Sequence, residues 1–350
     1  MHINSIVKKR PFIVSGPCSA ESLIQIKKIA DQTHNYIDVF RAGIWKPRTS
    51  PDSFEGAGKE GLKWLNEVQA KFNIKVSTEV GTAKHVEDCL EAKIDILWIG
   101  ARTTVNPFYV QEIAEALKGV DIPVFVKNPV HPEISLWIGA FERLYKSGLD
   151  NLTAVHRGFY SYGSSAYRND PKWEIPIELK SKFNNLPIIC DASHIAGKHN
   201  LILEISQIAM DLDMNGLMLE VHSDPKSALS DSEQQITPIE FKNILKNLIF
   251  RDGDLKSNKV KSKLAEIRKK IDKLDEKIVL TLKERESLVK EIANFKLEHG
   301  ITIFQLERWF EILRNRKSQA VEINLDKKII SDIFEQIHKF SIATQTRIMK

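Results

Sequence analysis

Four side chains that could bind a metal ion lie far apart in the chain. They are Cys18, His194, Glu220 and Asp231. A single cysteine is most often a small buried hydrophobe and a single loop histidine is usually structural, so the prediction depends on all four together. One thiolate, one imidazole and two carboxylates suit a divalent transition metal. Mn²⁺, Fe²⁺, Co²⁺ and Zn²⁺ all remain open, with availability rather than affinity choosing among them, and the sulfur disfavours Mg²⁺.

Cationic side chains follow other apolar runs of the chain. They are Arg41, Lys46, Arg48, Arg102, Lys127 and Arg157. Brought to one place, such cations repel each other unless anions neutralise them, and arginine binds phosphate and carboxylate in bidentate fashion. The pattern therefore predicts phosphorylated, carboxylated substrates. The alternative is a solvated loop for Lys46 and Arg48 and ion pairs within the barrel for Arg102, Lys127 and Arg157.

Apolar runs typical of buried strands precede these residues. They cover residues 12–16, 38–42, 74–79, 95–99, 122–127, 152–156, 186–190 and 215–221. Helical periodicity fills the segments between them, and strands that alternate with helices pair in parallel. A (β/α)₈ TIM barrel brings the C-terminal ends of all its strands to one face. We therefore predict an α/β barrel over residues 1–250, with the active site at that face.

The amino-acid composition of the chain changes after about residue 250. All 13 prolines precede residue 239, and Gly300 is the only glycine after Gly253. Residues 251–262 are polar and lack periodicity, which indicates a linker, and residues 263–350 form an all-α domain. Its helices are expected over about 260–298, 304–318 and 325–348, with Gly300 ending the first. Because one long helix cannot bury its apolar stripe in a monomer, we expect a homodimer through this domain.

Polar residues interrupt the apolar stripes of two of these helices. One stripe holds Ile278, Leu282, Arg285, Val289, Ile292 and Lys296, and the other holds Ile330, Phe334, Ile337, Ser341 and Gln345. Polar groups on a core stripe need a partner, so the stripes predict a ligand site. Snorkelling at the bundle edge is the alternative, and it explains one such residue better than four.

Composition excludes several classes of protein. The chain has 350 residues, of which 42% are hydrophobic, and no apolar stretch approaches the roughly 20 residues of a membrane span. The N-terminus lacks the order of a signal peptide, so we expect a cytoplasmic protein without membrane partners. Residues 259–350 hold 21 Lys/Arg against 14 Asp/Glu, but the charges are interleaved, so nucleic acid is not an expected partner. The three cysteines show no C-x-x-C spacing, which argues against a structural zinc site.

Short sequence blocks at the predicted strand ends form a distinctive series over about residues 10–250. They are Gly16-Pro17-Cys18-Ser19, Lys46-Pro47-Arg48-Thr49-Ser50 after Arg41, Gly100-Ala101-Arg102-Thr103, Val126-Lys127-Asn128-Pro129, His156-Arg157-Gly158, Asp191-Ala192-Ser193-His194 and Leu219-Glu220-Val221-His222. In order and spacing this series resembles 3-deoxy-D-arabino-heptulosonate 7-phosphate (DAHP) synthase of the short microbial type. The resemblance implies an aldol-like condensation of phosphoenolpyruvate with erythrose 4-phosphate.

The resemblance also implies a role for each candidate residue of the barrel. Cys18, His194, Glu220 and Asp231 bind the metal; Arg41, Lys46, Arg102, Lys127 and Arg157 hold phosphoenolpyruvate; Arg48, Thr49 and Ser50 meet erythrose 4-phosphate. Lys46 lies between the two anion sites in sequence and is a candidate for proton transfer, with a plain phosphate contact as its alternative role. The sibling 3-deoxy-octulosonate 8-phosphate synthase uses a similar barrel, but the Lys46–Ser50 block favours the four-carbon aldehyde.

The helical segment opens with Ile267-Arg268-Lys269-Lys270-Ile271-Asp272 and resembles the all-helical chorismate mutase, which converts chorismate to prephenate. The matching site positions are Arg268, Arg285, Lys296, Arg308, Ser341 and Gln345. By resemblance, Lys296 and Gln345 contact the ether oxygen and Arg268 crosses into the site of a partner subunit. Gln305 and Trp309 depart from the acid and the glutamate that the family commonly carries. The alternative is therefore a non-catalytic domain that binds chorismate or prephenate, dimerises and regulates the barrel allosterically.

Overall fold

The computed structural model describes residues 1–350 except 49, 51, 164 and 252–257. The chain divides into two compact units, Met1–Gly253 and Asp254–Lys350. Each unit is described by itself.

Eight strands form a closed parallel barrel in chain order. They are β1 (Phe12–Gly16), β2 (Val39–Arg41), β3 (Lys75–Val80), β4 (Ile96–Ile99), β5 (Val124–Lys127), β6 (Leu152–His156), β7 (Ile188–Asp191) and β8 (Gly216–Glu220). β1 closes the barrel against β8 in a register that pairs Phe12 with Gly216 and Gly16 with Glu220. The predicted TIM barrel is thus confirmed, since every predicted strand is present.

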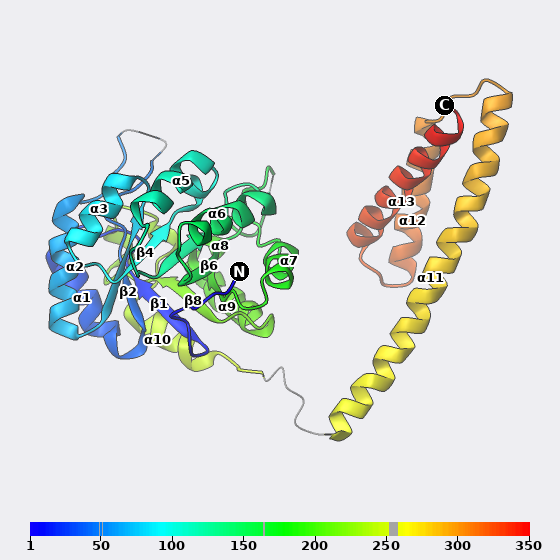
Figure 1. Ribbon diagram of the computed structural model, residues 1–350. Helices are drawn as coiled ribbons and strands as arrows, with labels where there is room; N and C mark the ends of the chain where they lie inside the picture. Colours follow the sequence, from blue (N-terminus) through cyan, green and yellow to red (C-terminus); the bar gives the residue numbers. More distant parts are fainter. Residues whose placement is uncertain (49, 51, 164, 252–257) are drawn as a thin grey trace. The chain divides into compact units, whose positions relative to one another are not determined.

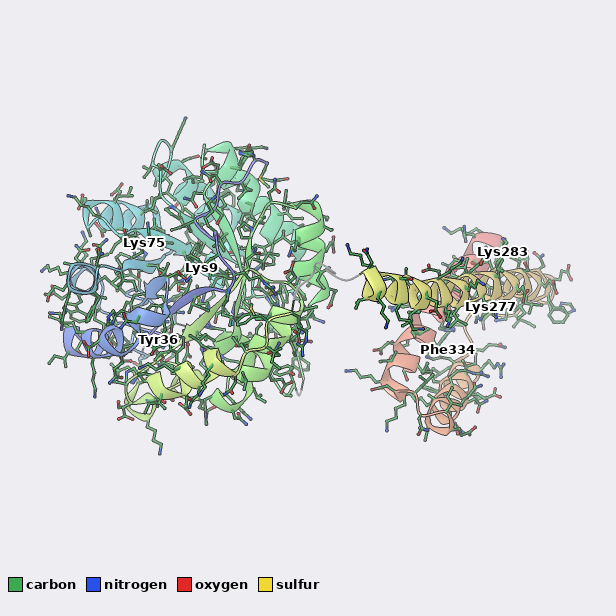
Figure 2. All side chains as sticks on the ribbon, turned by 90° about the horizontal axis from the view of Figure 1, so that it is seen from below. Lys9, Tyr36, Lys75, Lys277, Lys283 and Phe334 are labelled. Atoms are coloured by element: carbon green, nitrogen blue, oxygen red, sulfur yellow. The ribbon has the colours of Figure 1, made fainter. Side chains whose placement is uncertain are left out.

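Helices connect the strands and surround them (Figures 1 and 2). They are α1 (Leu23–Thr33), α2 (Lys59–Phe72), α3 (Ala83–Glu91), α4 (Ala101–Thr104), α5 (Pro107–Ala116), α6 (Ile134–Lys146), α7 (Glu174–Lys182), α8 (Ala192–Ala196), α9 (Ile202–Asp211) and α10 (Pro238–Asn247). Local capping explains several of their N-termini. The side chains of Ser22 and Thr82 accept hydrogen bonds from the first turns of α1 and α3, and Thr237 forms a capping box with Glu240.

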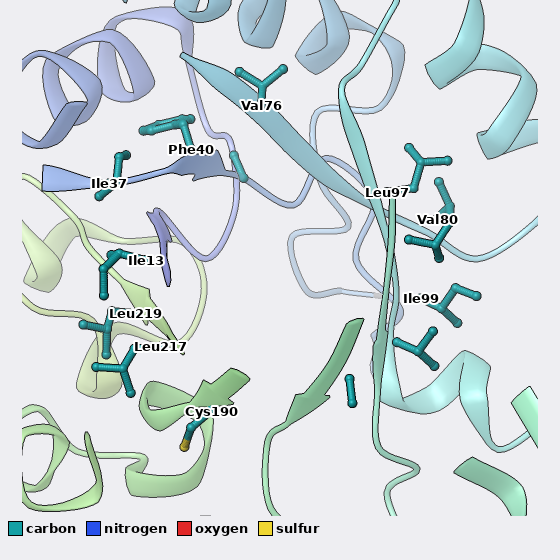
Figure 3. Close-up of a cluster of buried hydrophobic side chains, with 14 of the residues drawn as sticks. Ile13, Ile37, Phe40, Val76, Val80, Leu97, Ile99, Cys190, Leu217 and Leu219 are labelled. Carbon is teal, nitrogen blue, oxygen red and sulfur yellow. The ribbon is translucent and has the colours of Figure 1, made fainter. Parts of the chain in front are cut away.

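Alternating strand residues separate two layers of the barrel core. Ile13, Phe40, Val76 and Leu97 point outward and pack under the helices (Figure 3). Phe12, Val14, Val39, Trp98 and Phe125 belong to a second cluster inside the barrel. Successive side chains of a strand point to opposite faces of the sheet, which produces this division. Each apolar run of the sequence therefore supplies residues to both layers.

Over its described residues, the second unit contains three helices, α11 (Asn258–Glu298), α12 (Leu306–Glu322) and α13 (Lys327–Ile348). α13 packs against both α11 and α12 (Figure 1). Gly300 adopts a positive φ of 65° just after α11, and the Ile301 amide donates to the Lys296 carbonyl at 2.9 Å, which confirms Gly300 as the end signal. None of the described helices combines the length and the apolar content that crossing a membrane requires.

Helix α11 begins inside the predicted linker, close to the helix start expected at about residue 260. Residues 258–262 are the first turn of α11, while residues 252–257 lie outside the described residues. Lysine and glutamate favour helix intrinsically, and Lys263 and Lys270 both form ion pairs with Glu266 one turn away. A polar sequence therefore continues the helix without an apolar stripe.

Candidate functional site

A cavity of about 370 Å³ opens at the C-terminal ends of the barrel strands. Its lining includes five of the predicted cations: Lys46, Arg48, Arg102, Lys127 and Arg157. His194 and Asp231 line the same cavity, so predicted metal ligands and predicted anion-binding residues share one space. The structure thus brings together residues from seven different strand ends.

Three of the predicted metal ligands form a compact cluster. The Sγ of Cys18 and carboxylate oxygens of Glu220 and Asp231 all lie within 4.8 Å of one another. His194 lies beside this cluster, with its Nδ1 3.8 Å from Glu220 Oε1 and 2.9 Å from Asp191. Asp191 therefore orients the imidazole, in the way that a carboxylate commonly orients a metal-binding histidine.

Backbone geometry explains how these ligands meet. Gly16 ends β1 with a φ of 151°, and a Cβ there would lie 2.1 Å from the Arg41 carbonyl oxygen, so only glycine permits this approach. The chain then turns, and the Cys18 amide donates to Gln235 at 3.0 Å. Glu220 is the last residue of β8, and Asp231 follows in a loop with a positive φ of 50°.

The protonation of the cluster depends on its burial. Burial raises the pKa of the Cys18 thiol to about 12, and the Glu220 carboxylate adds to this rise. Burial also opposes ionisation of the two carboxyls, but His194 and Arg41 lower the pKa of Glu220, and His194 and Arg168 lower that of Asp231. The carboxylates are therefore ionised, whereas the thiol keeps its proton until a cation displaces it. This donor set fits a divalent transition metal.

The predicted cations make distinct contacts around the cluster. Arg41 is buried; it forms an ion pair with Glu220 at 3.1 Å and donates to the Cys18 carbonyl oxygen at 2.9 Å. Lys46 Nζ lies 3.0 Å from Cys18 Sγ, and Lys127 pairs with Asp191 at 2.8 Å. Lys46 and Lys127 line the cavity, whereas Arg41 is buried beside the ligand cluster and is not among the lining residues.

The surroundings of Arg157 favour the binding of an anion. Burial, and then the positive charges of Arg168 and Arg102, lower its pKa to about 10, although Asp191 opposes this shift. A bound phosphate or carboxylate would offset that cost by supplying the missing negative charge. The anion-binding interpretation of the cations therefore has a specific electrostatic basis.

The loop after β2 holds the residues predicted to meet the second substrate. Arg48 lines the cavity and donates from Nε to the Phe54 carbonyl oxygen at 3.2 Å. Ser50 is exposed, and Thr49 lies outside the described residues.

Sequence reasoning missed three residues of this site. Trp98 looked like an ordinary strand residue, but its indole N–H donates to Glu79 at 3.0 Å and its ring lies 4.7 Å from the Arg41 guanidinium. Arg168 pairs with Asp231 at 3.1 Å, and Gln234 donates to Glu220 at 2.6 Å. Arg168 and Gln234 belong to polar loops without periodicity, so no pattern marked them.

In the helical unit, the two polar-interrupted stripes face each other. Arg285 of α11 donates to the Ser341 hydroxyl of α13 at 2.6 Å, and Gln345 donates to the Ser341 carbonyl oxygen at 3.4 Å. Ser341 and Gln345 are buried, and Gln345 Oε1 has no hydrogen-bond partner within the described residues. The unit therefore holds an arginine and an unused acceptor among apolar side chains.

Lys296 lines a separate cavity of about 500 Å³ together with Gln305, and its Nζ donates to the Ile303 carbonyl oxygen at 2.7 Å. Trp309 stacks on His338 with ring centroids 4.0 Å apart and an interplanar angle of 14°. Arg268 and Arg308 are exposed, and Arg308 pairs with Glu311 at 2.6 Å. Among the described contacts, neither arginine bonds to the Arg285 cluster.

Acidification is expected to destabilise the barrel through His156. Burial lowers the pKa of His156 to about 3, so between pH 6.5 and 3 the unfolded chain binds a proton that the folded chain rejects. The free energy of unfolding therefore falls as the pH falls, by about 3 kcal/mol from this group between pH 6.5 and 4. Urea unfolding of the wild type and of His156→Phe, which keeps an aromatic ring beside Phe159 and Trp173, measures this slope. Equal slopes in both proteins would contradict the prediction.

The chain matches two families of known proteins. Residues 6–252 match the DAHP synthetase I family, and residues 267–346 match chorismate mutase type II. A phospho-2-dehydro-3-deoxyheptonate aldolase of Thermotoga maritima is 30% identical over 237 residues, which cover 67% of this chain and 68% of the relative. A 2-dehydro-3-deoxyphosphooctonate aldolase of Geotalea uraniireducens is 25% identical over 274 residues, which cover 71% of this chain and 94% of the relative.

Solved structures agree with the barrel. The crystal structure of the Thermotoga maritima aldolase, a DAHP synthase, has a TM-score of 0.61 at 29% identity and covers 67% of each chain. A truncated form of the 3-deoxy-D-arabino-heptulosonate 7-phosphate synthase from the same organism has a TM-score of 0.59 at 26% identity, covering 67% of this chain and 84% of its own.

Proposed function

The chain belongs to the DAHP synthetase I family and carries a type II chorismate mutase domain, and on this premise we propose that it is a metal-dependent bifunctional enzyme of the shikimate pathway. The barrel would condense phosphoenolpyruvate with erythrose 4-phosphate and consume one water, giving DAHP and phosphate. The helical unit would rearrange chorismate to prephenate.

The observation that carries the barrel proposal is the ligand cluster beside the cation-lined cavity. Cys18, Glu220 and Asp231 would hold the metal, with the His194 imidazole as a fourth ligand. Mn²⁺ is the first candidate, followed by Fe²⁺, Co²⁺ and Zn²⁺. When bound, the metal would supply Lewis acidity toward the aldehyde oxygen.

The cations would bind and orient the two phosphorylated substrates. Arg41, Lys46, Arg102, Lys127 and Arg157 would hold phosphoenolpyruvate, and Arg48, with Thr49 and Ser50, would hold erythrose 4-phosphate. Fixing both anions in one cavity converts a bimolecular reaction into a nearly unimolecular one. Lys46, whose ammonium lies 3.0 Å from Cys18 Sγ, would also be placed to move a proton between the substrates.

The helical unit would catalyse its rearrangement by electrostatics alone. Arg285 and Arg308 would bind the two carboxylates of chorismate, Lys296 and Gln345 would stabilise charge at the breaking ether bond, and Ser341 would position Arg285. These groups select the compact reactive conformer of the substrate.

A homodimer would complete this site with Arg268 of a second copy. Apolar residues of α11 lie exposed in a single chain, and they include Ile267, Ile271, Leu274 and Ile278, the last with 58% of its surface exposed. An uncovered stripe of this kind favours a second copy as its occupant. Sedimentation should therefore report the mass of two chains.

Two assays on the purified full chain test the proposal. Product formation from phosphoenolpyruvate and erythrose 4-phosphate should stop with EDTA and return with Mn²⁺. Chorismate should be consumed, with loss of its ultraviolet absorbance, whether or not EDTA is present. Condensation that persists in a chain verified to be metal-free would contradict the metal proposal.

A sensor role for the helical unit is the second candidate, and the Trp309–His338 stack favours it. This stack occupies the position where the family commonly carries a glutamate, so the unit would bind chorismate or prephenate without efficient turnover. Bound ligand would then inhibit the barrel if it favours one arrangement of the chain over another.

The sensor role predicts that prephenate inhibits condensation by the wild type, but not by Arg285→Ala or by a barrel truncated near residue 252. A coupling of about 1–3 kcal/mol corresponds to a 5–150-fold change in affinity. Condensation rates measured during a prephenate titration of all three proteins check this. Equal inhibition of all three would place the effector site in the barrel instead.

A further inference from the structure

Arg168 and Gln234 connect two of the candidate metal ligands. Arg168 lies in the loop between β6 and α7, and its Nη1 donates to Asp231 Oδ1 at 3.1 Å and also to Gln234 Oε1. The other end of the same amide, Gln234 Nε2, donates to Glu220 Oε2 at 2.6 Å. A continuous series of hydrogen bonds therefore runs from Asp231 through Arg168 and Gln234 to Glu220.

Each of these contacts engages one oxygen of its carboxylate, and the other oxygen faces the cluster, where Glu220 Oε1 also pairs with Arg41 Nη1 at 3.1 Å. Asp231 Oδ2 lies 3.1 Å from Cys18 Sγ, and Glu220 Oε1 lies 3.8 Å from the His194 imidazole. The oxygens engaged by Gln234 and Arg168 are Oε2 and Oδ1. Each carboxylate is thereby turned so that a single oxygen points toward Cys18 and His194.

The backbone holds both residues in place. Asp231 adopts a left-handed conformation with φ 50°, and the 3₁₀ turn Ser232–Gln234 follows at once, which brings Gln234 back over Glu220. Such a conformation is unusual for a residue other than glycine and marks a constrained position. Next to Arg168, Asn169 donates from its side chain to the His194 carbonyl oxygen at 2.6 Å. The Arg168 loop is thus anchored to the strand end that carries His194.

The contacts of Arg168 and Gln234 differ from those of an ordinary surface ion pair, because they include a buried side-chain amide. Although 45% of the Arg168 side chain is exposed, Gln234 is only 1% exposed, and both ends of its amide are engaged by charged partners. A buried amide of this kind is costly unless it is fully bonded, and here its bonds orient a carboxylate.

We infer that Arg168 and Gln234 form a carboxylate clamp, a pair of positioning residues that orients Asp231 and Glu220 for a divalent cation. This inference rests on the metal centre proposed above. Neither residue touches the cation; each acts through the ligand that it holds. Hydrogen-bond partners of this kind commonly change metal affinity by about 10- to 100-fold.

The test is a titration of metal-free full chain with Mn²⁺, in which free Mn²⁺ is measured by electron paramagnetic resonance. Gln234→Leu should raise the Kd for Mn²⁺ by about 10- to 100-fold, and Arg168→Met should raise it in the same direction. Condensation by Gln234→Leu should recover as Mn²⁺ is increased, because affinity rather than chemistry is impaired. Gln207→Leu, the same substitution on α9 away from the cavity, should bind Mn²⁺ like the wild type.

Each outcome decides a separate question. A wild type that binds no Mn²⁺ would contradict the proposed metal centre itself. A wild type that binds Mn²⁺, with both variants within twofold of its Kd, would overturn the carboxylate clamp. If Gln234→Leu does not fold, Arg168→Met decides alone, because its half-exposed side chain is replaced without opening the core.

Discussion

Cys18→Ala is expected to lower the rate of condensation at least about a thousandfold while chorismate turnover by the same chain stays within about twofold of the wild type. The substitution removes the only sulfur from the ligand cluster and the closest contact of the Lys46 ammonium. It leaves the helical unit, a separate compact part of the chain, unchanged. Steady-state kinetics of both reactions, with the metal content of the same samples, measures this contrast.

Cys89→Ala is the matched control for this substitution. Cys89 is also a fully buried free cysteine, but it lies on α3 in the outer core of the barrel. A general effect of a smaller core residue would appear in both variants, whereas loss of a ligand appears only in Cys18→Ala. His194→Ala should share the phenotype of Cys18→Ala. Full metal-dependent condensation by Cys18→Ala would refute the ligand assignment.

Arg285→Ala and Lys296→Ala are each expected to reduce chorismate turnover by about 100- to 1000-fold, with condensation retained. Lys296 is buried and Arg285 is partly buried in the helical unit, and removal of a charged donor aimed at developing negative charge has its largest effect where water is excluded. Burial already lowers the pKa values of both groups, because it disfavours their charged forms. A dianionic ligand would offset this desolvation penalty. The measurement is kcat/KM for chorismate, with far-ultraviolet circular dichroism of each variant.

Lys283→Ala is the control on the same helix. Lys283 is exposed on α11, where it pairs with Glu286 at 3.0 Å (Figure 2). Its removal should leave both chorismate turnover and helicity unchanged. If Arg285→Ala and Lys296→Ala also turn over chorismate like the wild type with unchanged helicity, these cations have only a structural role. Binding without turnover in the wild type would instead favour the sensor.

The barrel and the strand ends that carry most candidate residues could be predicted from local patterns in the sequence. Strands such as 12–16 and 152–156 and the stop at Gly300 depend on local periodicity and on backbone conformation, which a short window of sequence expresses. Alternation of strands with helices then requires a parallel sheet, and a parallel barrel delivers every strand end to one face. Helix α11 begins at Asn258, inside the predicted linker, because polar residues of high helix propensity extend it without an apolar stripe.

The way in which the functional groups meet depends on the closed barrel. Cys18 reaches Glu220 because β1 closes against β8 with Gly16 opposite Glu220, a register set by the packing of the whole barrel. The 3₁₀ turn Ser232–Gln234 returns Gln234 to Glu220 within one loop, whereas the assembled barrel places Arg168 beside Asp231 and Trp98 under Arg41. These residues lie in short turns, in polar loops or inside an apolar strand, so their types carry no periodic signal. The contacts of Arg168 and Trp98 join segments far apart in the chain, and they arise only when the barrel closes.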